Sequence, residues 1–110
     1  MTQPAPLPMV VPDCGLGSAA LAAQVDRYRR LMVPGATLHR TARRLTVTFA
    51  ADPEPALLDE TIAVERGCCA FFALDYDPGR RRLTIAVANP ERTVSLDALQ
   101  AALATVSSPA

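Results

Sequence analysis

The chain has 110 residues, half of them hydrophobic, and its 11 basic residues are balanced by 11 acidic ones at pH 7. This length supports one modest hydrophobic core and is too short for two domains. A net charge of zero gives no general attraction to phosphate backbones or anionic membranes, so we expect neither nucleic acid nor a membrane as a partner.

The beginning of the chain has no basic segment followed by an apolar run of the kind that directs export, and no stretch approaches the roughly 20 apolar residues of a membrane span. We therefore expect a cytoplasmic protein. Its three cysteines are an odd number for a disulfide framework, and a reducing compartment would keep them as thiols.

The first 17 residues are rich in proline and glycine. We expect a flexible lead over residues 1–8, one domain over residues 9–106 and a frayed end over residues 107–110. Within the domain, the apolar run Met9–Val11 predicts a short strand, followed by a turn that contains Cys14. Ser18 is a good N-cap for a first helix, whose apolar stripe has helical spacing and ends before a Pro-Gly pair. The stripe consists of Leu21, Val25, Tyr28 and Met32.

From residue 37 to residue 49 the hydrophobic period changes to two, which predicts two antiparallel strands with a turn over residues 40–43. Asp52 is the expected cap of a second helix, with Pro53 at its first position, and this helix should run to about Cys69. Two more alternating segments, residues 71–76 and 82–88, flank a strong turn signal at residues 77–80 and predict a second hairpin. Ser95 is the expected cap of a final helix.

The predicted order is strand, helix, strand, strand, helix, strand, strand, helix. Its first six elements match the βαββαβ pattern of ferredoxin-like domains. We therefore predict an α+β fold with a ferredoxin-like core, an extra strand, a C-terminal helix and a mostly antiparallel sheet.

Glu65 interrupts an apolar stripe on the second helix. Leu58, Ile62, Glu65 and Cys69 follow one another at spacings of four, three and four residues, so the carboxylate faces the predicted core. Buried carboxylates are costly unless they are paired or coordinated. Because Glu65 precedes the adjacent pair Cys68 and Cys69 by three and four residues, it can take up a proton from a thiol or join the coordination shell of a metal.

Adjacent helical residues point about 100° apart, so the two cysteines can share one site only where the helix unwinds, and Gly67 is placed to permit this. In a ferredoxin-like arrangement Cys14 and His39 should lie at the same end of the domain as the pair. Three thiolates would form a trigonal site for Hg(II), As(III) or Cu(I), and His39 as a fourth ligand would make a zinc site. The competing interpretation is that the cysteines fill the core as small hydrophobic residues and that His39 is an ordinary strand residue.

The segment Glu65-Arg66-Gly67-Cys68-Cys69-Ala70-Phe71-Phe72, with the hairpin and final helix that follow, resembles a family of small bacterial proteins with an E-x-x-C-C-x-F-[FL] signature. Similar segments are appended to some MerR-like regulators. The matching positions are Cys14, Glu65, Cys68, Cys69, Phe71 and Phe72. The resemblance implies kinship with metal- and stress-responsive proteins, including those of heavy-metal resistance, and implies no particular reaction.

The position of Cys14, between the first strand and the first helix, is also where heavy-metal-associated ferredoxin-like domains hold their metal. Those domains use a C-x-x-C motif, whereas this chain has Cys14-Gly15-Leu16-Gly17. Only the pair at the end of the second helix can supply the missing sulfur ligands.

Three hypotheses follow. The first is a soft-metal or metalloid binding domain with Cys14, Cys68 and Cys69 as thiolate ligands and Glu65 as a base or fourth ligand, serving sequestration, delivery or sensing. The second is a thiol enzyme, similar to an organomercurial lyase or a redox protein, with Glu65 as the proton donor. The third is a metal-free interaction module that forms a homodimer through a sheet edge or its last helix.

Overall fold

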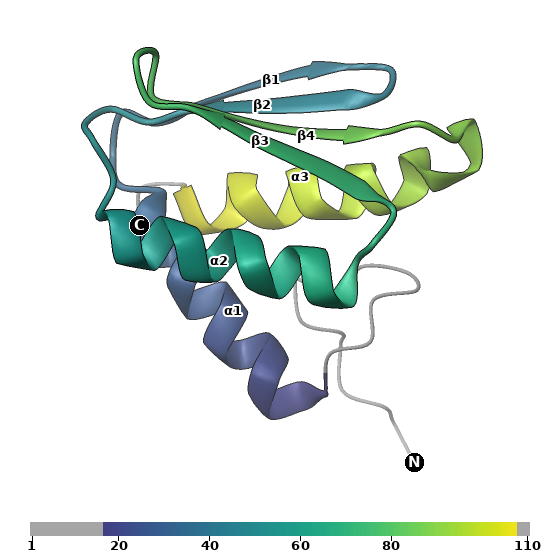
Figure 1. Ribbon diagram of the computed structural model, residues 1–110, viewed down its shortest axis with the longest axis horizontal. Helices are drawn as coiled ribbons and strands as arrows, with labels where there is room; N and C mark the ends of the chain where they lie inside the picture. Colours follow the sequence, from purple (N-terminus) through teal and green to yellow (C-terminus); the bar gives the residue numbers. More distant parts are fainter. Residues whose placement is uncertain (1–16, 108–110) are drawn as a thin grey trace.

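The computed structural model describes residues 17–107 and contains three α-helices, a short 3₁₀-helix and one antiparallel sheet (Figure 1). The elements in chain order are α1 (Ser18–Leu31), β1 (Thr37–Thr41), β2 (Arg44–Thr48), α2 (Pro55–Cys68), β3 (Phe72–Asp77), β4 (Arg82–Val87), η1 (Pro90–Arg92) and α3 (Thr93–Ser107). The predicted α+β class and antiparallel sheet are confirmed. The predicted lead, the strand Met9–Val11 and Cys14 lie outside the described residues.

The four described strands are arranged in the order β1-β2-β4-β3, and every neighbouring pair is antiparallel. The predicted extra strand, β4, is therefore central, because it pairs with β2 on one side and with β3 on the other. In a ferredoxin-like sheet that central position belongs to the first strand of the βαββαβ pattern. The described order α-β-β-α-β-β-α is consistent with a ferredoxin-like core with additional elements, and β4, the last described strand, occupies an inner position.

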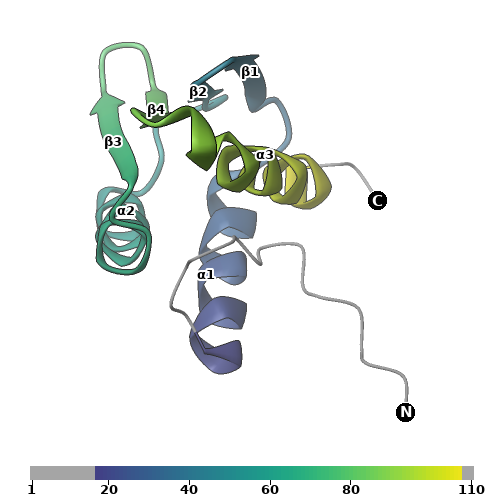
Figure 2. The same cartoon turned by 90° about the vertical axis from the view of Figure 1, so that its right-hand side faces the viewer.

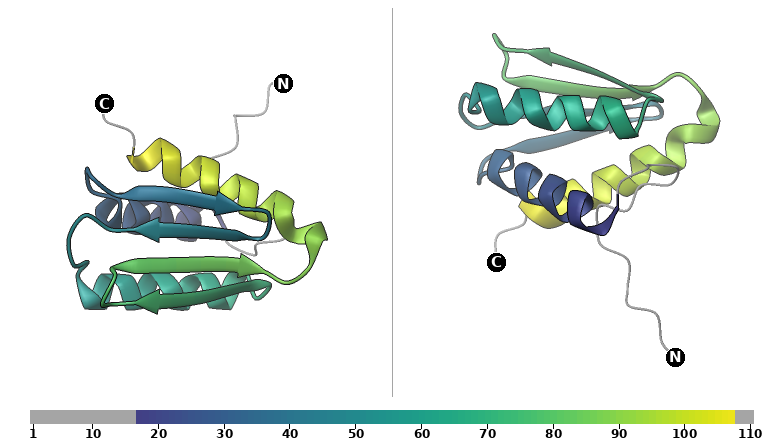
Figure 3. Two further views of the ribbon diagram at one scale, coloured as in Figure 1. Left: turned by 90° about the horizontal axis from the view of Figure 1, so that it is seen from above. Right: turned by 60° about the horizontal axis from the view of Figure 1, so that its bottom comes forward.

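All three helices lie on one side of the sheet (Figure 1). α2 packs beside β3, α3 contacts β2 and β4, and α1 packs against both other helices (Figure 2). The opposite sheet face is not covered by any described element (Figure 3). The alternation along β2 and β4 fits this arrangement, since Leu45, Val47, Leu83 and Ile85 are buried while the threonines between them are only half-buried.

Three helix starts differ from the sequence prediction. Ser18, the predicted N-cap, is the first helical residue of α1, and Gly17 is the N-cap. α2 begins at Pro55, not after Asp52, and Glu54 is its N-cap with an extended backbone. A residue that precedes proline is disfavoured in the helical region, which keeps Glu54 out of the helix. α3 begins at Thr93, two residues before the predicted cap, because η1 leads directly into it and Asn89 accepts the hydrogen bond from the Glu91 N–H.

Candidate metal centre

Three predicted site residues meet at the C-terminal end of α2, where the chain turns into β3 (Figure 1). One ligand atom from each of Glu65, Cys68 and Cys69 lies within 4.8 Å of the other two. The two sulfur atoms are 3.5 Å apart, which is too long for a disulfide bond. This arrangement confirms that these three side chains lie close enough together to hold a metal ion.

The adjacent cysteines meet because the helix ends between them. Cys68 is the last residue of α2, whereas the backbone of Cys69 has left the helical region at φ −125° and ψ 67°. The Cys69 N–H still donates to the Glu65 carbonyl at 2.7 Å, and the Cys69 carbonyl accepts from the Phe72 N–H at 2.9 Å. Both backbone polar groups of Cys69 are therefore held in place.

Gly67 does not supply the predicted unwinding. It lies within α2, and glycine-only backbone conformations are not used there, because Gly35 is the only described glycine with a positive φ. A side chain at Gly67 would meet nothing within 4 Å. The change of direction at Cys69 is achieved by an ordinary residue at the helix end.

The Glu65 side chain is 2% exposed, and α1 supplies its polar partners. Gln24 donates through Nε2 to Glu65 Oε1 at 3.1 Å, and the Tyr28 hydroxyl donates to the same oxygen at 3.0 Å. The second oxygen, Oε2, is buried and has no hydrogen-bond partner among the described residues. The carboxyl group is thus held by hydrogen bonds at one oxygen only.

Gln24 is itself oriented by its neighbours. Its Nε2 also donates to the Thr61 carbonyl at 3.0 Å, and its Oε1 accepts from Arg27 at 2.8 Å. Arg27 in turn forms an ion pair with Glu60 at 3.2 Å. A polar chain therefore runs from the surface, through Arg27 and Gln24, to the buried carboxyl group.

Burial raises the pKa of Glu65 above its ordinary value of 4.5, and Gln24, Tyr28 and the Cys69 thiol only partly offset this effect. The pKa of Tyr28 is also raised well above its ordinary value of 10.0, first by burial and then by the neighbouring Glu65 carboxylate. Both shifts favour the neutral forms of the two side chains. The Glu65 carboxyl group can therefore keep its proton next to the two thiols.

The two sulfur atoms differ in their access to solvent. Cys69 is fully buried in the hydrophobic core, whereas Cys68 is half-buried. Phe71 and Phe72 follow at once with their rings in an edge-to-face contact at 4.8 Å, and the Arg92 guanidinium lies over Phe71 at 4.6 Å. Both phenylalanines pack against the hydrophobic core, where Phe72 is buried and Phe71 is half-buried.

The structure agrees with the interpretation of His39 as an ordinary strand residue and not with its alternative role as a fourth ligand. His39 is exposed on β1, at the edge of the described sheet farthest from β3 and α2, so β2 and β4 lie between it and the cysteines. The structure does not bring His39 into the Glu65–Cys68–Cys69 group. The sequence did not indicate that β1 lies at the edge of the described sheet farthest from β3, and this sideways separation keeps His39 away from the end of α2.

Sequence reasoning missed Gln24 and assigned Tyr28 to the core without a polar role. Gln24 is three residues after Leu21 and four before Tyr28, so it lies on the apolar stripe of α1. The same signal, a polar residue on a buried stripe, had drawn attention to Glu65. If this signal is applied to both α1 and α2, it predicts a buried polar contact between the two helices.

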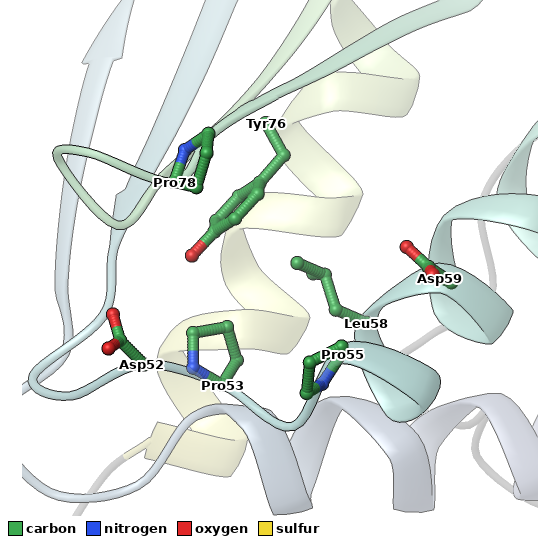
Figure 4. Close-up of a pocket in the computed structure, with 7 residues that line it drawn as sticks. All are labelled: Asp52, Pro53, Pro55, Leu58, Asp59, Tyr76 and Pro78. Carbon is green, nitrogen blue, oxygen red and sulfur yellow. The ribbon is translucent and has the colours of Figure 1, made fainter.

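A separate surface pocket of about 470 Å³ lies at the other end of α2 (Figure 4). Pro53, Leu58 and Tyr76 line it, and the carboxylates of Asp52 and Asp59 stand at its edge. The length of α2, about 20 Å at 1.5 Å per residue, separates this pocket from the cysteines. This pocket is not part of the Glu65–Cys68–Cys69 group.

No known protein family, curated protein or solved structure matched this chain when it was compared with them. None of the helices over residues 17–107 is both long and apolar enough to cross a bilayer.

Proposed function

We propose that this protein is a cytoplasmic domain that binds a soft metal or metalloid ion through Cys68 and Cys69, with Cys14 as a third thiolate. Glu65 would act as a base for the thiols or as an oxygen ligand. The observation that carries this proposal is the approach of two sulfur atoms and a buried carboxyl oxygen to within 4.8 Å of one another. Thiolates are the donors that select soft ions.

The unpartnered Oε2 of Glu65 supports the same proposal. A buried polar atom without a hydrogen bond costs free energy, on the order of 1–3 kcal/mol. An ion, or a ligand carried by that ion, would give this oxygen a partner. The polar chain through Gln24 and Arg27 would then act as the outer shell that orients the carboxyl group.

Native mass spectrometry of the reduced, anaerobically purified full chain tests the proposal. Zn(II), Cu(I), Hg(II) and As(III) are added separately to the wild type and to Cys14→Ser, Cys68→Ser and Cys69→Ser, with His39→Ala as a matched control far from the group. We expect one ion per chain in the wild type and in His39→Ala, and weaker binding in each cysteine variant.

Each contrary result removes a defined part of the proposal. Unchanged binding in Cys14→Ser removes Cys14 from the ligand set. No binding of any ion by the wild type contradicts the proposal and favours a metal-free interaction module, whose homodimer would then be visible in the same spectra.

A thiol-dependent enzyme is the second candidate, and the raised pKa of Glu65 beside two thiols favours it. In such an enzyme Cys68 and Cys69 would form two Hg–S bonds as the C–Hg bond and the bond from mercury to its counter-anion break. The Glu65 proton would pass to the carbon, one thiol proton would return to Glu65, and the other would leave with the anion. Release of benzene from phenylmercury, lost in Glu65→Gln, would support this candidate. Stoichiometric binding without benzene release would contradict it.

A further inference from the structure

The distance between the two sulfur atoms restricts the coordination geometry of an ion bound to both. With metal–sulfur bonds of about 2.3 Å, sulfur atoms that are 3.5 Å apart subtend an angle of about 100° at the ion. A linear ion with the same bond length would need its two sulfur atoms about 4.6 Å apart. The pair therefore matches ions with pyramidal or tetrahedral bonds better than ions that prefer two opposite ligands.

The fold limits how far the Cys69 sulfur can move, and this limits the distance between the two sulfur atoms. The Cys69 side chain is fully buried, and its backbone N–H and carbonyl are both hydrogen-bonded. Rotating its sulfur away from Cys68 would move it within a closely packed core, which is unfavourable. The half-buried Cys68 adjusts more easily, but it belongs to the last turn of α2.

The third donor near the pair is an oxygen atom. Glu65 Oε1 already accepts hydrogen bonds from Gln24 and Tyr28, so the unpartnered Oε2 is the atom available to a ligand. The described residues thus offer two sulfur atoms and one oxygen. Two sulfur atoms and one hydroxyl group that uses Oε2 as its hydrogen-bond acceptor complete the surroundings of a three-coordinate pyramidal ion, whereas a structural zinc site requires four ligands.

From this geometry we propose that the Cys68–Cys69 pair is a chelating site for trivalent arsenic, with the third arsenic bond directed toward Glu65. This inference depends on the proposed function and specifies its ligand class. In arsenous acid, two As–O bonds break and two As–S bonds form. Each thiol proton leaves with one hydroxyl group as water, and arsenic and sulfur keep their oxidation states. The remaining hydroxyl group donates a hydrogen bond to Glu65 Oε2.

The test uses full-length Cys14→Ser, in which Cys68 and Cys69 are the only sulfur donors from cysteine. The reduced protein is titrated anaerobically with arsenite, Hg(II) and Zn(II), while mass spectrometry gives the stoichiometry and X-ray absorption the ligands of the bound ion. We expect one arsenic per chain with two sulfur neighbours and one oxygen neighbour. Hg(II) should instead bridge two chains, because one pair does not span a linear ion.

A second variant, Cys14→Ser with Glu65→Met, separates the role of the oxygen from that of the sulfur pair. Phenylarsine oxide has no hydroxyl left once both sulfur atoms have replaced its oxygen, so its affinity should stay within about threefold of that in Cys14→Ser. The affinity for arsenite should fall about tenfold or more, the range seen when outer-shell partners are removed. The spectrum of phenylarsine oxide binding also shows that the variant is folded and its thiols are intact.

Two outcomes overturn the inference while the proposed function stands. One is a linear, one-to-one Hg(II) complex of Cys14→Ser that forms although arsenite does not bind. The other is zinc binding that excludes arsenite at equal concentration. Failure of the wild type to bind any ion overturns the proposed function itself, so the two failures are distinguishable.

Discussion

Gln24 and Glu65, 41 residues apart in the sequence, are joined by a buried hydrogen bond of 3.1 Å that links α1 to α2. The same Gln24 amide nitrogen also reaches the Thr61 carbonyl one turn earlier on α2. These two contacts make the interface between the helices polar next to the cysteines. The position of α1 and the orientation of the Glu65 carboxyl group are therefore coupled.

Replacing Gln24 with leucine should lower both stability and ion affinity. The change removes one of the two buried donors to Glu65 Oε1 and the side-chain donor to the Thr61 carbonyl, and we expect a loss of about 1–3 kcal/mol in the free energy of unfolding. Ion affinity should fall about tenfold, because the carboxyl group loses an orienting partner. Urea denaturation and competition with a chromogenic chelator measure the two effects.

Gln100→Leu is the matched control for this variant. Gln100 accepts a hydrogen bond from Arg40, which also pairs with Asp97, so the arginine keeps a partner. We expect a smaller change in stability and no change in ion affinity. Equal affinities in the two glutamine variants would contradict an orienting role for Gln24.

The stability of the metal-free protein should decrease as pH rises, because of Glu65. Burial raises its folded-state pKa above the ordinary value of 4.5 that applies to the unfolded chain. The protonated Glu65 therefore makes its full favourable contribution to the free energy of unfolding below pH 4.5. This contribution is lost as pH rises through the folded-state pKa.

Glu65→Gln removes this titration, because a glutamine stays neutral at every pH. Urea denaturation in the presence of a chelator, repeated across this pH range, should show the variant gaining stability relative to the wild type as pH rises. Two parallel curves would show that Glu65 ionises as readily in the folded protein as in the unfolded chain.

The two cysteines of the pair should react at different rates. Iodoacetamide should modify the half-buried Cys68 in the native protein, whereas the fully buried Cys69 should react only after unfolding. Mass spectrometry of digested protein assigns each modified site. A bound ion should protect Cys68, and native modification of Cys69 ahead of Cys68 would contradict the burial pattern.

Replacing each cysteine with serine extends this comparison to stability. Cys69→Ser places a hydroxyl group in the core and should cost about 1–3 kcal/mol, whereas Cys68→Ser should cost less than about 1 kcal/mol. Urea denaturation measures the loss in the free energy of unfolding for each variant. Equal losses would show that the environments of Cys68 and Cys69 do not differ as the structure indicates.

Two glycines provide a further pair of opposite predictions. Gly35 has a φ of +99°, and an added Cβ would lie 2.9 Å from the Ala50 Cβ, so Gly35→Ala should destabilise the protein by more than about 1 kcal/mol. Gly67 is helical with open space around it, so Gly67→Ala should stabilise by about 0.5–1 kcal/mol. Thermal unfolding measures both effects.

Ion titration of Gly67→Ala completes this test. Unchanged affinity is expected, because Cys69 leaves the helix without help from Gly67. A marked loss of affinity would restore the idea that the site needs a flexible residue before the cysteines.

Local patterns predicted most of the described elements. Both hairpins and all three helices were predicted from hydrophobic period and turn residues, and the turn at Asp77 forms as expected, with its carboxylate accepting hydrogen bonds from the Gly79 and Arg80 N–H groups. The stripe of α2 is buried as predicted, including Glu65 and Cys69. These features depend on residues that are close in the chain.

Features that depend on distant residues were not predictable in the same way. The central place of β4 follows from its pairing with both β2 and β3, and alternation along a strand does not specify its partners. The separation of His39 from the cysteines has the same origin. The contacts of Glu65 with Gln24 and Tyr28 join two helices, so neither helix alone indicates them.

The inner position of β4 also determines what a shortened chain can retain. β2 and β3 do not pair with each other, so the sheet is continuous only through residues 82–87. A fragment that ends before residue 82 keeps α1, α2 and every donor of the Glu65–Cys68–Cys69 group, yet it contains only the first hairpin and a lone β3. The geometry of the Glu65–Cys68–Cys69 group therefore depends on a sheet that becomes continuous only when a later segment of the chain has been synthesised.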